Sequence, residues 1–382
     1  MKLLDKTTLA LLCSMMLAAA GCEGPEGEAG DPGPGGDQGP AGPDGPQGPV
    51  GPGGPAGSPG SGVCTEFQLP GEAFFPEGIA LAADGDVFVG SITTGDIVVF
   101  DAESQDPDHA QFLDLPDDAI AGGTLGILLI EGGGDRTLIA CDSIPNPTDA
   151  KSSRLVKIDV TDIANPTVIS THALAPIAAD ANVFCNDVAV DSDGNVYVTD
   201  SFGGQVQQIA ADAADGDAAT VWTAQADLAG NAENPFGANG IAVLNDGTND
   251  FVFVVNYSLG TLQRFQINAD GTAGAPVAVT LTDGMDQPVT LRGPDGFKAI
   301  GNDTLIVVEN GANSLTKVVL SDAFGATPTG KTTVLSSRLD VPTTVAIDGT
   351  SALVVEGQLD HLLNPTLGAP QLPFCVSRVQ IY

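Results

Sequence analysis

Basic residues are scarce in this chain of 382 residues. Only 13 lysines and arginines stand against 49 aspartates and glutamates, which gives a formal net charge of −36 at pH 7. So acidic a surface repels the phosphates of nucleic acids and anionic lipid headgroups, and it attracts cations. We therefore expect no nucleic-acid partner, and contact with a membrane only through a covalently attached lipid.

Long apolar runs and the common catalytic motifs are also missing. After the N-terminal segment, no stretch offers the roughly 20 apolar residues that a transmembrane helix needs. The sequence has no Gly-x-Ser-x-Gly motif, which would mark a serine nucleophile. Its three histidines, His109, His172 and His361, lie outside the repeated strand starts described below. Nothing in the sequence therefore indicates a nucleophilic mechanism based on histidine.

The N-terminal residues resemble a bacterial lipoprotein signal. Two lysines precede a largely apolar stretch over residues 7–20, which leads into Gly-Cys22. In such signals the cysteine thiol becomes the attachment point of a lipid after cleavage. The resemblance predicts a signal peptide over residues 1–21, lipidation at Cys22 and an extracytoplasmic bacterial lipoprotein of the outer membrane or cell surface. Cleavage and secretion without a lipid is the alternative.

Glycine occupies every third position from Gly24 to Gly60. The triplets are rich in proline, which is typical of collagen, because only glycine fits the crowded axis of three wound chains. At about 3.1 Å per residue, such a segment would form a rod of roughly 120 Å. We therefore expect a collagen-like stalk over residues 22–62, either as a homotrimer or as a single polyproline-II chain.

Four cysteines remain after the signal and the lipidated residue: Cys64, Cys141, Cys185 and Cys375. An even number of cysteines in an oxidising compartment is compatible with two disulfides. None of them forms a Cys-x-x-Cys or histidine-flanked pattern, so a zinc site built from cysteines is not indicated.

Residues 63–382 contain six copies of one unit. The clearest copy, residues 183–210, has an apolar strand, an Asp-Gly turn, a second strand, another turn with glycine and a third strand. Repeats that start 48 to 61 residues apart can each hold four antiparallel strands. The sequence therefore predicts an all-β fold, a six-bladed β-propeller. The aligned first strands start at Glu77, Leu125, Asn186, Asn239, Asp295 and Thr344.

Closure of the ring requires one blade to be shared between the two ends of the repeat region. We expect residues 64–70 to supply the outer strand of the blade that ends with residues 374–382. Cys64 and Cys375 would then lie on neighbouring strands, where a disulfide would latch the ring. Cys141 and Cys185 fall in adjacent blades and would form the second pair, with buried free thiols as the alternative.

The repeat alignment brings polar side chains together in the central channel. The first strand of each blade lines the channel, so equivalent residues converge on one level. Two carboxylates in a partly desolvated channel repel each other, and a divalent cation removes that conflict. These side chains could instead hydrogen-bond strand ends and channel water. The level holds Glu77, Asn186, Asn239 and Asp295, with Leu125 and Thr344 completing it.

The order of these residues resembles the regucalcin/gluconolactonase family: Glu in the first blade, Asn-Asp in the third, Asn-Gly in the fourth and Asp-Gly in the fifth. The resemblance implies that Glu77, Asn239 and Asp295 bind a divalent metal, with calcium expected first and magnesium, manganese or zinc as alternatives. It also implies that Asn186 contacts the substrate or the water on the metal. Asp295 would be the catalytic residue, the general base or acid in lactone hydrolysis.

One feature of the family is missing. Its sugar-lactone hydrolases often carry an arginine two residues before the third-blade asparagine, and Phe184 stands there in this chain. We therefore expect either a metal-dependent hydrolase of a small-molecule lactone or ester, which could be more apolar than a sugar lactone, or a non-catalytic propeller displayed for ligand or protein binding. A propeller of the streptogramin-lyase or NHL type is a third alternative, although the channel lacks the histidines typical of the lyase.

Overall fold

The computed structural model describes residues 64, 66–100, 110–116, 119–143, 153–179 and 181–382. The expected signal peptide, the lipidation at Cys22 and the collagen-like stalk lie outside these residues. In the described part of the chain, no helix is both long and apolar enough to cross a membrane. The helices there are short: η4 (Ala226–Leu228), η5 (Asn310–Ala312), α2 (Leu359–Leu363) and η6 (Pro365–Leu367).

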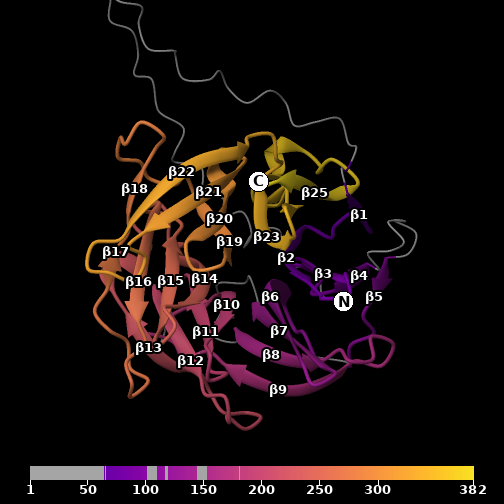
Figure 1. Ribbon diagram of the computed structural model, residues 1–382. Coiled ribbons are helices and arrows are strands. Elements are labelled where there is room, and N and C mark those ends of the chain that lie inside the picture. Colours follow the sequence, from indigo (N-terminus) through magenta and orange to yellow (C-terminus); the bar gives the residue numbers. More distant parts are fainter. Residues whose placement is uncertain (1–63, 65, 101–109, 117–118, 144–152, 180) are drawn as a thin grey trace, which may run out of the picture.

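Six sheets stand around a central axis, each forming a blade, and the innermost strands are β2, β6, β10, β14, β19 and β23 (Figure 1). This confirms the predicted six-bladed β-propeller. Blade 1 holds β2 (Pro76–Leu81), β3 (Val87–Ser91), β4 (Ile97–Phe100) and β5 (Gln111–Phe112). Blade 2 holds β6 (Gly123–Gly132), β7 (Asp135–Ser143), β8 (Arg154–Asp159) and β9 (Thr167–Ala173). Blade 3 holds β10 (Cys185–Val190), β11 (Val196–Asp200), β12 (Gln205–Ile209) and β13 (Thr220–Ala224).

Blade 4 follows the same plan, whereas blades 5 and 6 depart slightly from it. Blade 5 gains a fifth strand, because β18 pairs in parallel with β22, and blade 6 takes its outer strand from the N-terminal side of the repeats. Blade 4 holds β14 (Ala238–Asn245), β15 (Asp250–Asn256), β16 (Thr261–Gln266) and β17 (Val277–Ala278). Blade 5 holds β18 (Thr280–Thr282), β19 (Pro294–Ile300), β20 (Thr304–Glu309), β21 (Ser314–Ser321) and β22 (Thr329–Ser336). Blade 6 holds β1 (Phe67–Leu69), β23 (Pro342–Asp348), β24 (Ser351–Glu356) and β25 (Phe374–Gln380).

The ring closes in blade 6 as the sequence predicts. Strand β1 pairs antiparallel with β25, with Gln68 opposite Cys375. A disulfide joins Cys64 to Cys375 at this junction. A second disulfide joins Cys141 on β7 to Cys185 on β10, and so links blade 2 to blade 3. These are the two pairs expected from the blade assignment.

Every inner strand carries a β-bulge two residues long near its first residue. In β2 the register shifts between Pro76 and Ile79, and in β23 it shifts between Pro342 and Val345. The same shift recurs in β6, β10, β14 and β19. A bulge of this kind interrupts the alternation of side chains and re-aims the residues within it. The bulges are therefore where the six strands can present polar groups at one level.

The bulge corrects one position of the repeat alignment. The residue equivalent to Glu77 in blade 6 is Thr343 and not Thr344, because Pro76 and Pro342 occupy matching places in their ladders. Thr343 is fully buried, and its hydroxyl donates a hydrogen bond of 2.9 Å to the backbone carbonyl of Glu77. Two consecutive threonines give no hydropathy cue to the register, so the sequence left this shift undetected.

Glycine fills the second bulge position in four blades. A Cβ atom at Gly78, Gly126 or Gly240 would lie 2.1 to 2.4 Å from a backbone carbonyl oxygen of the next inner strand. No side chain fits at such a distance, so glycine is what lets neighbouring bulges approach so closely. Outside the bulges, apolar side chains on both faces of each blade fill the space between blades, as Ile79 and Phe88 do on opposite faces of blade 1.

Candidate functional site

The first bulge position places four polar side chains from four different blades at equivalent points of the ring. All four are almost fully buried, with 3 to 5% of their surface exposed. They are the residues named in the sequence analysis: Glu77 on β2, Asn186 on β10, Asn239 on β14 and Asp295 on β19.

Electrostatics link two of these residues directly. Burial raises the pKa of Glu77 well above its ordinary value, and the negative charges of Asp295 and Asp187 raise it further. Burial also raises the pKa of Asp295 well above its ordinary value, and Asp187 adds to this effect. A hydrogen bond from the Asn239 side chain acts in the opposite direction on Asp295. Glu77, Asn239 and Asp295 are thus close enough to influence one another.

Asp187 is a third buried carboxylate that the sequence analysis did not assign to the site. It fills the second bulge position of blade 3, where four other blades have glycine. Its two carboxylate oxygens accept hydrogen bonds from the backbone N–H groups of Val188, at 2.9 Å, and Ile241, at 3.3 Å. Asp187 therefore ties blade 3 to blade 4, and burial raises its pKa. The break in the glycine pattern was the signal that could have revealed it.

Lys298 supplies a positive charge to the same group. Its charge lowers the pKa of both Glu77 and Asp187. Lys298 lies opposite Ile306 in the strand pairing. Four of the other five inner strands have alanine at the equivalent position. One ammonium group thus acts on two of the three carboxylates, which leaves negative charge uncompensated when all three are ionised. The alanines are Ala80, Ala189, Ala242 and Ala346.

Two buried oxygen atoms at this level have no hydrogen-bond partner among the described residues: Oε2 of Glu77 and Oδ1 of Asn239. A buried polar atom without a partner costs free energy, so native proteins rarely leave one unpaired without a reason. Carboxylate and carboxamide oxygens are ligands that calcium and magnesium prefer. The residues present therefore fit a hard divalent cation. Histidine, cysteine, aspartate and glutamate alone form no metal-binding group of three in the described chain, so such a site needs the carboxamide of Asn239.

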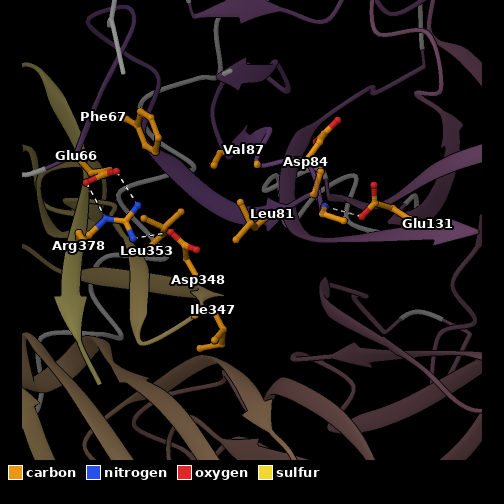
Figure 2. A pocket seen from close by; sticks show the side chains of 14 residues that line it. Glu66, Phe67, Leu81, Asp84, Val87, Glu131, Ile347, Asp348, Leu353 and Arg378 are labelled. Atoms are coloured by element: carbon orange, nitrogen blue, oxygen red, sulfur yellow. Dashed lines mark hydrogen bonds and ion pairs between the residues drawn. The ribbon is translucent and has the colours of Figure 1, made fainter. Parts of the chain in front are cut away.

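A separate pocket of about 530 Å³ lies between blades 1 and 6, at the opposite ends of the inner strands (Figure 2). On one side, Arg378 binds Glu66 at 2.7 Å and Asp348 at 2.6 Å. On the other side, Glu131 accepts a hydrogen bond from the backbone N–H of Ala83 at 2.8 Å. Phe67, Leu81, Val87 and Leu353 contribute apolar surface between these groups.

Comparison with known proteins agrees with the fold. A β-propeller repeat family matches residues 177–199, and no curated protein matches the chain in sequence. Regucalcin from Agrobacterium tumefaciens, described as a calcium-binding protein, is 13% identical, with 83% of this chain and 95% of that chain covered and a TM-score of 0.51. The chain is a six-bladed β-propeller.

Two further solved propellers are similar to the same extent. The PQQ-bound aldose sugar dehydrogenase from Streptomyces coelicolor is 14% identical over 84% of this chain and 96% of that chain, with a TM-score of 0.52. A luciferin-regenerating enzyme is 14% identical over 84% and 95%, with a TM-score of 0.53. The names of these propellers indicate different activities. The shared fold therefore does not determine the activity of this chain, which has to be inferred from its own site.

Proposed function

We propose that the channel binds one divalent metal ion, calcium first, and that the protein hydrolyses a small-molecule lactone or ester there. The metal ligands would be Glu77, Asn239 and Asp295. The observation that carries the proposal is a pair of buried oxygens, on Glu77 and Asn239, that have no hydrogen-bond partner in the described part of the chain and lie beside the carboxylate of Asp295. The calcium-binding regucalcin from Agrobacterium tumefaciens, which has the same fold, supports the choice of metal.

The residues of the site have distinct roles in this proposal. When bound, a divalent ion supplies a Lewis acid that polarises the carbonyl oxygen of the substrate. Asp295 accepts a proton from the attacking water and returns it to the leaving oxygen, the general-base and general-acid role that the family resemblance implies for it. Asn186 orients the water or the substrate oxygen by hydrogen bonding. The almost complete burial of all four side chains keeps bulk water from competing.

Metal titration followed by an activity screen tests the proposal. Calorimetry with calcium chloride should show one site in the wild-type chain and none in Glu77→Gln. Asp212→Asn, which neutralises an exposed carboxylate in the turn between β12 and β13, well away in sequence from the bulges, is the matched control. Absence of binding by calcium, magnesium and manganese to the wild type would refute the metal site. A panel of lactones and aryl esters, assayed with the bound metal, then tests hydrolysis.

Lys298 favours a second candidate, a non-catalytic propeller displayed for ligand binding. An ammonium group near Glu77 and Asp187 can offset their charges without a metal. If Lys298 is that counter-ion, Lys298→Met should unfold at a lower temperature than the wild type in metal-free buffer. If a metal occupies the site, the same variant should bind calcium more tightly, because one repelling charge is gone.

We further propose the location that the N-terminal residues predict: an extracytoplasmic lipoprotein, held by a lipid on Cys22 and displayed on a collagen-like stalk. Labelling with radioactive palmitate should fail in Cys22→Ser. Sedimentation of the lipid-free chain, with and without residues 24–62, distinguishes a homotrimer from a monomeric stalk.

A further inference from the structure

Four aromatic side chains form a continuous arc at the bulge end of blades 3 and 4. The ring centroids of Phe184, Phe202 and Phe236 lie 5.0 to 5.6 Å apart, so each ring contacts the other two. Tyr257 extends the arc, with its ring centroid 6.2 Å from that of Phe236. Distances in this range are typical of favourable aromatic pairs.

The chain fixes this arc beside the bulge residues. Phe184 lies two residues before Asn186, and Phe236 lies three before Asn239. Backbone hydrogen bonds hold the turns that carry the other two rings: the N–H of Ser201 donates to the carbonyl of Phe184 at 3.0 Å, and the N–H of Tyr257 donates to that of Gly237 at 2.9 Å.

Tyr257 brings the arc to the fifth blade. A Cβ atom at Gly293, two residues before Asp295, would lie 3.2 Å from Cζ of Tyr257, so this ring packs against the segment that leads into Asp295. Its hydroxyl donates a hydrogen bond of 2.9 Å to Oδ1 of Asn310. The arc therefore runs along the site from Asn186 past Asn239 to Asp295, and its one hydroxyl already has an acceptor.

The arc has a supporting part and an accessible part. Phe184 and Phe236 are buried, with 5% and 9% of their surface exposed. Phe202 and Tyr257 are only partly buried, and Leu259, two residues after Tyr257, is 39% exposed. Apart from the hydroxyl of Tyr257, the side chains of this wall are apolar, whereas a polyhydroxylated sugar needs hydrogen-bond partners for its hydroxyls.

We propose that the arc binds the aromatic part of the substrate, which makes the substrate an aryl lactone or aryl ester. This inference rests on the proposed hydrolysis in the channel and names its substrate class. The reacting carbonyl lies over the bulge residues while the aryl ring stacks against Phe202 and Tyr257. Hydrolysis consumes one water: the bond between the acyl carbon and the aryl oxygen breaks, the hydroxyl of the water joins the acyl carbon, and its proton reaches the aryl oxygen.

Binding of a lactam that cannot be hydrolysed tests the arc separately from catalysis. Calorimetry compares 3,4-dihydroquinolin-2-one, which carries a fused benzene ring, with δ-valerolactam, which lacks it, in buffers with and without calcium. The wild type should prefer the aromatic lactam by about tenfold, the gain expected from one stacked ring. Phe202→Ala and the better-packed Phe202→Leu should both lose most of this preference. Phe112→Ala, which removes an exposed aromatic on β5, should keep it.

The outcomes separate the two proposals. Equal binding of the two lactams by the wild type, or an unchanged preference in both Phe202 variants, overturns the arc as a substrate site. Failure to bind any divalent metal overturns the proposed function, and the preference measured without calcium then still decides whether the arc binds aryl groups. Preference for the aromatic lactam together with hydrolysis of dihydrocoumarin but not of glucono-δ-lactone is the result expected when both hold.

Discussion

Acidic residues have opposite electrostatic surroundings at the two ends of the inner strands. At the bulge end, Glu77, Asp187 and Asp295 are buried within each other's electrostatic field, with Lys298 as the cation that lowers the pKa of two of them. At the hairpin end, Glu66 and Asp348 are held by Arg378 in the pocket between blades 1 and 6 (Figure 2).

The contrast shows which carboxylates serve the fold and which are available for a ligand. Hydrogen bonding to Glu66 raises the pKa of Arg378, as expected when each partner stabilises the charge of the other. Burial raises the pKa of Glu77, which means that its charged form is not stabilised by its surroundings. A carboxylate paired with arginine, such as Glu66, stabilises the junction between blades 1 and 6. A buried carboxylate whose charge is destabilised, such as Glu77, would be stabilised by a bound cation.

The largest expected effect tests the bulge end. Asp295→Ala should weaken calcium binding at least about 100-fold, because it removes a charged ligand from a site with few ligands. Calorimetry with calcium chloride measures the change. Asp348→Asn alters a carboxylate at the hairpin end and should leave calcium affinity as in the wild type. An equal loss of calcium affinity in the two variants would show that the carboxylates at the two ends do not differ in calcium binding.

The reverse experiment concerns stability. Arg378→Met leaves Glu66, whose side chain is 8% exposed, without its guanidinium partner. We expect a loss of about 2–3 kcal/mol in the free energy of unfolding, since an unpaired buried charge is costly. Urea unfolding measures it, and calcium affinity should be unchanged. The double variant with Glu66→Gln should recover part of the loss; a double variant as unstable as the single one would argue against the ion pair.

Calcium affinity should depend on pH only through the bulge end. The pKa values of Glu77 and Asp295 are raised, so protons compete with the cation as the pH falls through those values. We expect affinity to fall by up to about tenfold per pH unit in that range, which corresponds to one proton released on binding. Calorimetry in two buffers of different ionisation enthalpy counts the proton. The proton count should fall towards zero as the pH rises above the raised pKa values, and a count that does not change with pH would place its source elsewhere.

The smallest expected effect is on stability and concerns Asp340, a carboxylate that belongs neither to the bulge-end group nor to the Arg378 ion pairs. It lies two residues before β23, and burial together with Asp360 and Glu356 raises its pKa to about 6, from an ordinary value of 3.8. The folded state therefore holds a proton more tightly than the unfolded state, so this group's contribution to stability is lost as the pH rises from about 4 to 6. At pH 7.5, Asp340→Asn should raise the free energy of unfolding by about 1 kcal/mol. Thermal unfolding at pH 4 and 7.5 checks it: an equal gain at both values would contradict the titration.

Local alternation and turn chemistry were enough to find the blades. The Asp-Gly turn at 84–85 and the alternating residues around it predict a hairpin because side chains of a strand alternate between its faces. Alternating strands joined by short polar or glycine-containing turns recur six times, and this repeat predicted the strand order, the shared blade with β1 and β25, and the pairing partners of the cysteines. It also placed Glu77, Asn186, Asn239 and Asp295 at equivalent positions.

Residues that break the repeat could not be assigned in this way. Asp187 stands where other blades have glycine and Lys298 where most have alanine, and only the folded ring shows that the two belong to one charge network. The one-residue error at Thr344 has the same origin, because a bulge adds a residue without changing the apolar pattern on either side of it.

The sequence by itself determined a six-bladed propeller and the positions that meet at its axis, because repeats and alternation are local properties of the chain. Only the tertiary structure decided which charges are paired, which oxygens are left without partners and which rings touch. Those properties depend on distances between blades, and residues more than 50 positions apart, such as Glu77 and Asp295, acquire them only when the ring has closed.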